Sequence, residues 1–208
     1  MSSVYVEYTN EWLAADQDAE PIEAARALVR TQAERVNVHL TPERIEALAS
    51  VMMPALELAQ NEDPPPVMVL FLCPDAEEPI ITSVKIRAED LPEPATLADL
   101  ADEVRLPVEM LEQPAIEEIV DTRSGPALHV VQRYREPVDA HVEQVQEHEV
   151  FAWIVDDDGP LLVTLSTSYV DLAAASEWRP DLIALAKTLI IEPDTDDFTG
   201  QEASLPDR

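Results

Sequence analysis

Glycine is nearly absent from this chain, which has only 3 glycines among 208 residues. Nucleotide-binding loops such as the dinucleotide fingerprint and the Walker A loop need several glycines so that backbone N–H groups can approach phosphates. Neither pattern occurs, and the Gly-x-Ser-x-Gly turn of many serine hydrolases is also missing. These absences argue against nucleotide-binding enzymes and against hydrolases of that type.

Cysteine and basic residues are also scarce. Cys73 is the single cysteine, so no intrachain disulfide is possible, which fits a reducing compartment. The chain has 13 basic residues against 43 acidic ones, and Lys85 and Lys187 are the only lysines. The formal net charge of -30 repels nucleic acids and anionic membranes, so neither is an expected partner.

Signals for export and membrane insertion are missing. The opening residues, MSSVYVEYTNEW, lack a basic segment followed by an apolar one, and no apolar run reaches the roughly 20 residues that span a bilayer. We therefore expect a cytoplasmic protein. Apolar residues make up 46% of the chain, which is enough for a sizeable core, and the length favours one domain over residues 1–191.

Two amphipathic helices are predicted in a helical part over residues 20–60. Apolar residues recur three and four positions apart in residues 21–36 and again in residues 41–59. Thr41 is a favourable N-cap, and proline at the next position fits the first helical turn. Pro54 lies inside the second helix, and we expect it to kink or split that helix.

Strands of an antiparallel sheet are predicted over residues 66–170. Residues 67–73 form an unbroken apolar run, and residues 80–87 return beside them as a hairpin. Thr96 and Asp99 form a capping-box pattern that predicts a short helix through residue 104. Residues 127–135 are predicted to form a strand, with Leu128 on one face and His129 on the other. Further strands are expected at residues 4–8, 116–121, 143–155 and 161–169.

The C-terminal part is predicted to contain a tight turn, a closing helix and a tail. Asp156, Asp157 and Asp158 precede Gly159, and an Asp-Gly pair favours a hairpin turn. An EF-hand calcium loop does not fit, because leucine and threonine occupy the later ligand positions. The closing helix is expected to begin at Pro180 and end at 191, followed by an acidic flexible tail over residues 192–208.

The segment His141–Glu149 is the best candidate for a metal site, because it contains two histidines and three glutamates. In a regular strand His148 faces away from Glu147 and Glu149, and the spacing matches no known ligand motif. A polar strand is therefore the preferred interpretation. We assign no metal, no cofactor and no catalytic residue to this sequence.

Three tryptophans are the largest aromatic side chains. Trp153 lies in a predicted strand and is expected in the core. Trp12, in an acidic segment, and Trp178, just before the predicted closing helix, are the candidates for contact with a partner protein, because exposed tryptophans often dominate binding. Packing of Trp178 against the sheet is the alternative.

The C-terminal half resembles the PsbP-like superfamily, which includes the Mog-type Ran-binding proteins and bacterial PsbP-like proteins. The resemblance covers about residues 66–191 and is carried by VFAWIVDDDGPLLVTLSTS, VDLAAASEW and PDLIALAKTLII, preceded by IEEIVD and ALHVVQRYR. It implies an α-β-α sandwich around a mainly antiparallel sheet, and mostly non-catalytic binding functions. It carries over no functional residue, because the superfamily shares no active site.

The sequence therefore predicts an α+β protein that binds another protein. A partner with a basic surface would suit the acidic charge of the chain. A narrower alternative is an inhibitor, immunity protein or secretion chaperone that masks a basic effector. A third alternative is a hydrolase with carboxylate or metal chemistry. The oligomeric state is open.

Overall fold

A long pair of strands lies at the centre of the fold. The computed structural model describes residues 4–8, 12–72, 83–91, 96–137, 143–156 and 160–193. In it, β7 (Glu143–Asp156) pairs antiparallel with β8 (Pro160–Tyr169), from Asp156 opposite Pro160 to Glu147 opposite Tyr169. This confirms the predicted strand pair, while residues 157–159 of the predicted turn lie outside the described residues.

The central strands belong to a sheet of seven strands in the order β2-β3-β4-β8-β7-β6-β5, and every neighbouring pair is antiparallel. The fold is α+β, with a mainly antiparallel sheet against which helices pack, as the sequence predicted. The other strands of this sheet are β2 (Trp12–Ala14), β3 (Met68–Leu72), β4 (Ser83–Asp90), β5 (Ile116–Thr122) and β6 (Gly125–Pro137).

Two helices begin at residues whose side chains cap them. In α2 (Pro42–Gln60), the Thr41 side chain accepts a hydrogen bond from the Arg44 amide, and in α3 (Leu97–Val104) Thr96 and Asp99 form the predicted capping box. No helix among the described residues is long and apolar enough to cross a membrane. The remaining helices are α1 (Pro21–Arg35), the short 3₁₀ helix η1 (Val108–Met110) and α4 (Leu172–Thr188).

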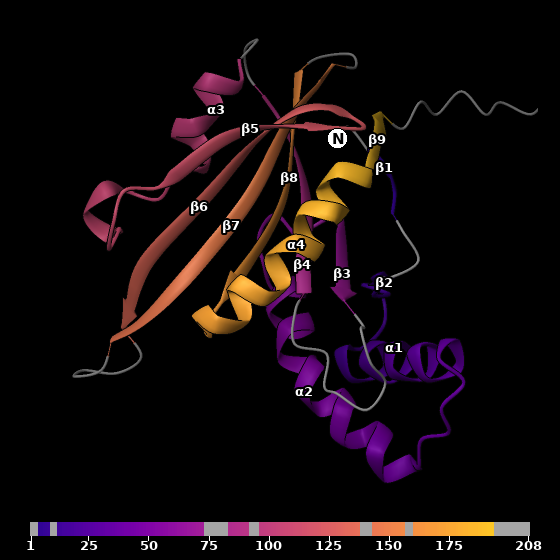
Figure 1. Cartoon of the computed structure of the whole chain (residues 1–208). Helices are drawn as coiled ribbons and strands as arrows, with labels where there is room; N and C mark the ends of the chain where they lie inside the picture. Colours follow the sequence, from indigo (N-terminus) through magenta and orange to yellow (C-terminus); the bar gives the residue numbers. More distant parts are fainter. Residues whose placement is uncertain are drawn as a thin grey trace, which may run out of the picture.

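The two faces of the sheet are covered differently (Figure 1). On one face, α4 packs over Phe151, Trp153 and the apolar residues beside them. On the other face, α1 and α2 cover one end, against Val69 and Phe71, and α3 covers the other end. The middle of this second face is therefore left without a helix.

Some predicted boundaries were wrong. The closing helix begins at Leu172, not at Pro180, because Asp171 caps it: the Asp171 side chain accepts from the Ala173 amide at 2.9 Å. Pro54 does not split α2, which is assigned as one helix. Residues 192 and 193, predicted to start the tail, belong to β9 (Ile190–Pro193), which pairs with β1 (Val4–Glu7) in a small second sheet.

Candidate functional site

Strand β5 forms one edge of the large sheet, and its outer side pairs with no other strand in the described part of the chain. Its isoleucines, Ile116 and Ile119, are 60% and 56% exposed. An edge strand offers a row of backbone N–H and C=O groups to another chain. Exposed β-branched side chains along such an edge make it a suitable template for strand addition.

The elements next to β5 extend this apolar surface. Val108 and Met110 of η1 are 74% and 44% exposed. A cavity of about 760 Å³ lies between α3 and β5, with Ile119 and Leu128 in its lining. Apolar side chains of a partner therefore have both a surface and a cavity to enter.

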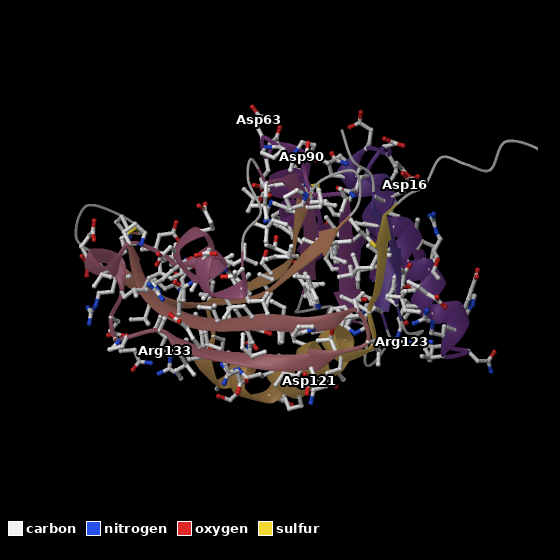
Figure 2. All side chains as sticks on the ribbon, turned by 90° about the horizontal axis from the view of Figure 1, so that it is seen from above. Asp16, Asp63, Asp90, Asp121, Arg123 and Arg133 are labelled. Atoms are coloured by element: carbon white, nitrogen blue, oxygen red, sulfur yellow. The ribbon has the colours of Figure 1, made fainter. Side chains whose placement is uncertain are left out.

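Acidic residues surround these apolar groups. Residues 97–122 contain eight acids and a single base, Arg105, which pairs with Asp102 at 3.1 Å and Glu117 at 2.6 Å. Glu103, Glu109 and Asp121 are exposed and form no ion pair with any described residue. Figure 2 marks Asp121 on β5. We call the four exposed apolar residues Val108, Met110, Ile116 and Ile119, with these three acids, the β5-edge surface.

A second cluster of charged residues lies buried between the sheet and α4. The His129 ring is held between two carboxylates: its Nδ1 lies 2.9 Å from Glu118 Oε1, and its Nε2 lies 2.8 Å from Glu149 Oε1. The same ring stacks on Phe151, with ring centroids 4.1 Å apart. These contacts fix the orientation of the ring between β5 and β7.

Two arginines complete this buried network. Arg179 of α4 bonds to Glu147 and to Glu149, the latter at 3.1 Å, and Arg133 of β6 donates to Glu147 at 2.7 Å. Glu147 and Glu149 are 1% and 0% exposed, so each carboxylate depends on these partners for its charge. The network therefore fixes α4 on the sheet.

Tyr169 lies beside the same network. Its side chain is buried, and its hydroxyl has no hydrogen-bond partner among the described residues. Burial, followed by the negative charge of Glu149, raises the pKa of Tyr169 well above its usual range. The hydroxyl therefore stays protonated.

The side chains of the candidate metal segment, residues 141–149, do not point to one place. His148 points to the face opposite Glu147 and Glu149, as its strand position predicted, and His141 lies outside the described residues. No group of three or more histidine, cysteine or carboxylate side chains that could hold a metal ion is present within the described ranges.

The two candidate contact tryptophans have different positions. Trp12 is 2% exposed and belongs to the core cluster beneath α4, so a partner cannot reach it in this structure. Trp12 belongs to the three-residue strand β2, which the acidic residues around it did not indicate. Trp178 is half-buried against the same core, and its role in partner contact stays a prediction. Trp153 is in the core, as predicted, and Cys73 lies outside the described residues.

Sequence reasoning missed both the β5-edge surface and the buried network. The alternation of β6 had placed His129 and Arg133 on one face, but their partners depend on the pairing of β6 with β5 and β7. Glu118 opposes His129, and Glu147 opposes Arg133, only in the observed register. The sequence signal was the series of charged residues at alternate positions, Glu147, Glu149, His129 and Arg133.

Comparison with known proteins gives a distant structural likeness. No protein-family model and no curated protein matches the chain. Among solved structures the chain is similar to LpqN, described as involved in cell envelope biogenesis of Mycobacterium tuberculosis. The two have a TM-score of 0.47 and 8% sequence identity, over 92% of this chain and 86% of that chain.

Proposed function

We propose that this chain is a non-catalytic binding protein whose partner is another protein, and that an extended basic and apolar segment of the partner pairs with β5. The observation that carries the proposal is the open edge of β5 with Ile116 and Ile119 exposed between acids. Main-chain hydrogen bonds would supply affinity, and the apolar side chains would supply specificity.

The negative charge of the β5-edge surface favours a partner segment that is positively charged. Glu103, Glu109 and Asp121 have no pairing cation among the described residues, and the whole chain carries a net charge of -30. A basic segment would be attracted at long range and would associate faster at low salt. An acidic or anionic partner would be repelled.

Broader parts of the same proposal rest on the sequence. Membership of the PsbP-like superfamily stays a prediction, supported by the antiparallel sheet with helices on both faces. Action in the cytoplasm stays a prediction too. The narrower role of masking a basic effector, as an inhibitor, immunity protein or secretion chaperone, would be supported by a neighbouring gene for a toxin or secreted substrate.

No observation among the described residues favours the hydrolase alternative. Its carboxylate or metal chemistry needs an accessible group of acids or histidines. The acids that do converge, Glu147 and Glu149, are buried and paired with arginines. A hydrolase would become the better interpretation if the purified chain turned over a substrate and substitution of one acid abolished the activity.

The proposal is tested with a random peptide library displayed against the immobilised full chain. We expect the selected peptides to alternate basic and apolar residues. Binding should weaken at least about tenfold in Ile119→Asp, because an apolar contact is lost and the new carboxylate loses its hydration in the complex. Asp121→Lys should slow association and reduce the salt dependence.

Val51→Asp is the matched control, because Val51 is 58% exposed, close to the 56% of Ile119, but lies on α2 away from β5. It should leave peptide binding unchanged. Selection of no peptide at low or high salt would contradict the proposal, as would equal binding by wild type and Ile119→Asp.

A further inference from the structure

A polar cavity of about 410 Å³ occupies the middle of the sheet face that faces away from α4. It lies between α2 and strands β4, β6, β7 and β8, where the two helical ends of this face leave the sheet uncovered. Lys85 opposes Ser166, and His148 opposes Ser168, so the strand register aligns these side chains on the cavity floor. The size is within the range of small-ligand pockets.

Two cations lie together on the β4 side of this cavity, away from the Glu136 carboxylate on β6. Lys85 and Arg87 both bind the single carboxylate of Glu62, which follows α2. The side chains of Lys85 and Arg87 are only 20% and 26% exposed. The chain has 43 acids and 13 bases. One of its two lysines nevertheless lies beside an arginine, and the two share a single carboxylate.

These cations have more hydrogen-bond donors than they have acceptors among the residues that the structure describes. A guanidinium has five N–H donors and an ammonium has three. Arg87 donates to Glu62 and, at 3.4 Å, to Ser166 Oγ, and Lys85 donates to Glu62. The remaining N–H groups are partly shielded from water, so an oxygen-rich anion in the cavity would provide acceptors that water supplies incompletely.

Uncharged polar groups and one further carboxylate, Glu136, line the β6 and β7 side of the cavity, where the Gln146 side chain donates to Glu136. His148 Nδ1 lies 2.9 Å from Ser168 Oγ, and the Tyr134 hydroxyl donates to Gln146 Oε1 at 3.0 Å. Burial lowers the pKa of His148, and Arg87 and Lys85 lower it further, so the ring is neutral at pH 7. Hydroxyl, amide and neutral imidazole groups suit the hydroxyls of a sugar or polyol.

We propose that this cavity binds a small polyhydroxylated molecule that carries one oxyanion group, either a sugar phosphate or a sugar acid. The oxyanion would lie at Lys85 and Arg87, and the hydroxyls would face Ser168, His148 and Tyr134. This site does not depend on the proposed strand addition at β5, because no residue of β5 lines the cavity. A cationic ligand would meet Lys85 and Arg87 and be repelled.

Titration of the full-length chain followed by amide NMR shifts is the direct test, with glucose 6-phosphate, gluconate, glucose and sulfate as probes. We expect both sugar anions to shift amides in residues 83–87, 146–148 and 166–168, and glucose to bind at least about tenfold more weakly than the better sugar anion. Whether glucose 6-phosphate or gluconate binds more tightly identifies the oxyanion. No shifts in these segments, or equal affinity for sulfate and both sugar anions, would overturn the proposal.

Substitutions separate this site from general charge effects. Arg87→Gln should weaken binding at least about tenfold, because a charge-assisted hydrogen bond is lost. Arg26→Gln is the matched control: the Arg26 side chain is 25% exposed and pairs with Glu46 of α2. It should leave the affinity unchanged.

Ser168→Ala provides a second variant that does not alter an ion pair, because Ser168 is exposed and its hydroxyl contacts the uncharged side chains of His148 and Tyr134. It should weaken binding a few-fold, with an unchanged melting temperature. Equal affinity in Arg87→Gln and wild type, or equal losses in Arg87→Gln and Arg26→Gln, would overturn the proposal.

Discussion

The two faces of the seven-stranded sheet hold charged residues in different ways. Under α4, Arg133 and Arg179 are matched by Glu147 and Glu149, and the carboxylates are fully buried. On the other face, Lys85 and Arg87 share Glu62 and line a cavity. Full burial requires a partner for every charge, whereas in an open cavity two cations can share one carboxylate and be stabilised further by solvent or a ligand.

This difference indicates which charged residues stabilise the fold and which are available to bind a ligand. A network whose members satisfy one another beneath a helix contributes to the fold and offers nothing to a ligand. Partly shielded donors in a cavity cost stability unless they find acceptors, so they point to binding. The comparison makes three predictions about stability, of decreasing size.

Arg179→Met should have the largest effect. It removes the cation that bonds both buried carboxylates, so Glu147 and Glu149 lose a compensating charge. We expect the free energy of unfolding to fall by about 3–5 kcal/mol, measured by urea denaturation. Arg26→Met, which breaks pairs with the exposed carboxylates of Glu23 and Glu46, should cost much less. Equal costs would mean that the two faces do not differ as described.

Leu182→Ala should have the next largest effect. Leu182 of α4 is 0% exposed and packs in the core beneath that helix, so truncation leaves a cavity. We expect a loss of about 2–4 kcal/mol in unfolding free energy. Leu58→Ala, at a leucine that is 61% exposed on α2, should change it by about 0.5 kcal/mol or less. A large cost at Leu58 would show that the cavity face is packed more closely than its exposure indicates.

His148→Gln should have the smallest effect, visible only as pH dependence. Burial, with Arg87 and Lys85, lowers the folded-state pKa of His148, while the Thr167 backbone and Glu149 oppose this. The unfolded chain therefore takes up the proton first, and this group's contribution to stability is complete above about pH 6.5 and falls at lower pH. Glu62, bound to both cations, faces the same cavity and is unchanged in the variant.

Urea denaturation between pH 7.5 and 5 measures this effect. The wild type should lose more stability over this interval than His148→Gln, because the variant has no proton to bind at this position. Identical pH profiles for the two proteins would contradict the prediction that His148 is held neutral by its surroundings.

Local patterns in the sequence were sufficient for most helices and strands. The capping residues Thr41 and Thr96 marked two helix starts, and the alternation of apolar residues in β6 identified its two faces. These signals are local, because a cap or a strand face depends on residues within a few positions. The antiparallel sheet followed from strands joined by short turns.

The remaining features depend on contacts between distant residues. Pro180 resembled a helix start, but Asp171 caps the helix two turns earlier and the sheet supports its first residues. Trp12 became buried because β2 pairs with β3, which its acidic neighbours did not indicate. The cavity also needs β4, β7 and β8 in register before Lys85 and His148 share a floor, and no local pattern specifies that register.

The small sheet of β1 and β9 determines how the chain would respond to mechanical force. Val4 pairs with Pro193, and Glu7 pairs with Ile190, so the outer ends of both strands lie at the same end of this sheet. A force that pulls residues 4 and 193 apart would act across the hydrogen bonds and break the pairs one after another, beginning with Val4 and Pro193. Such unzipping needs little force, so this pair would open before the seven-stranded sheet beneath α4 is disturbed.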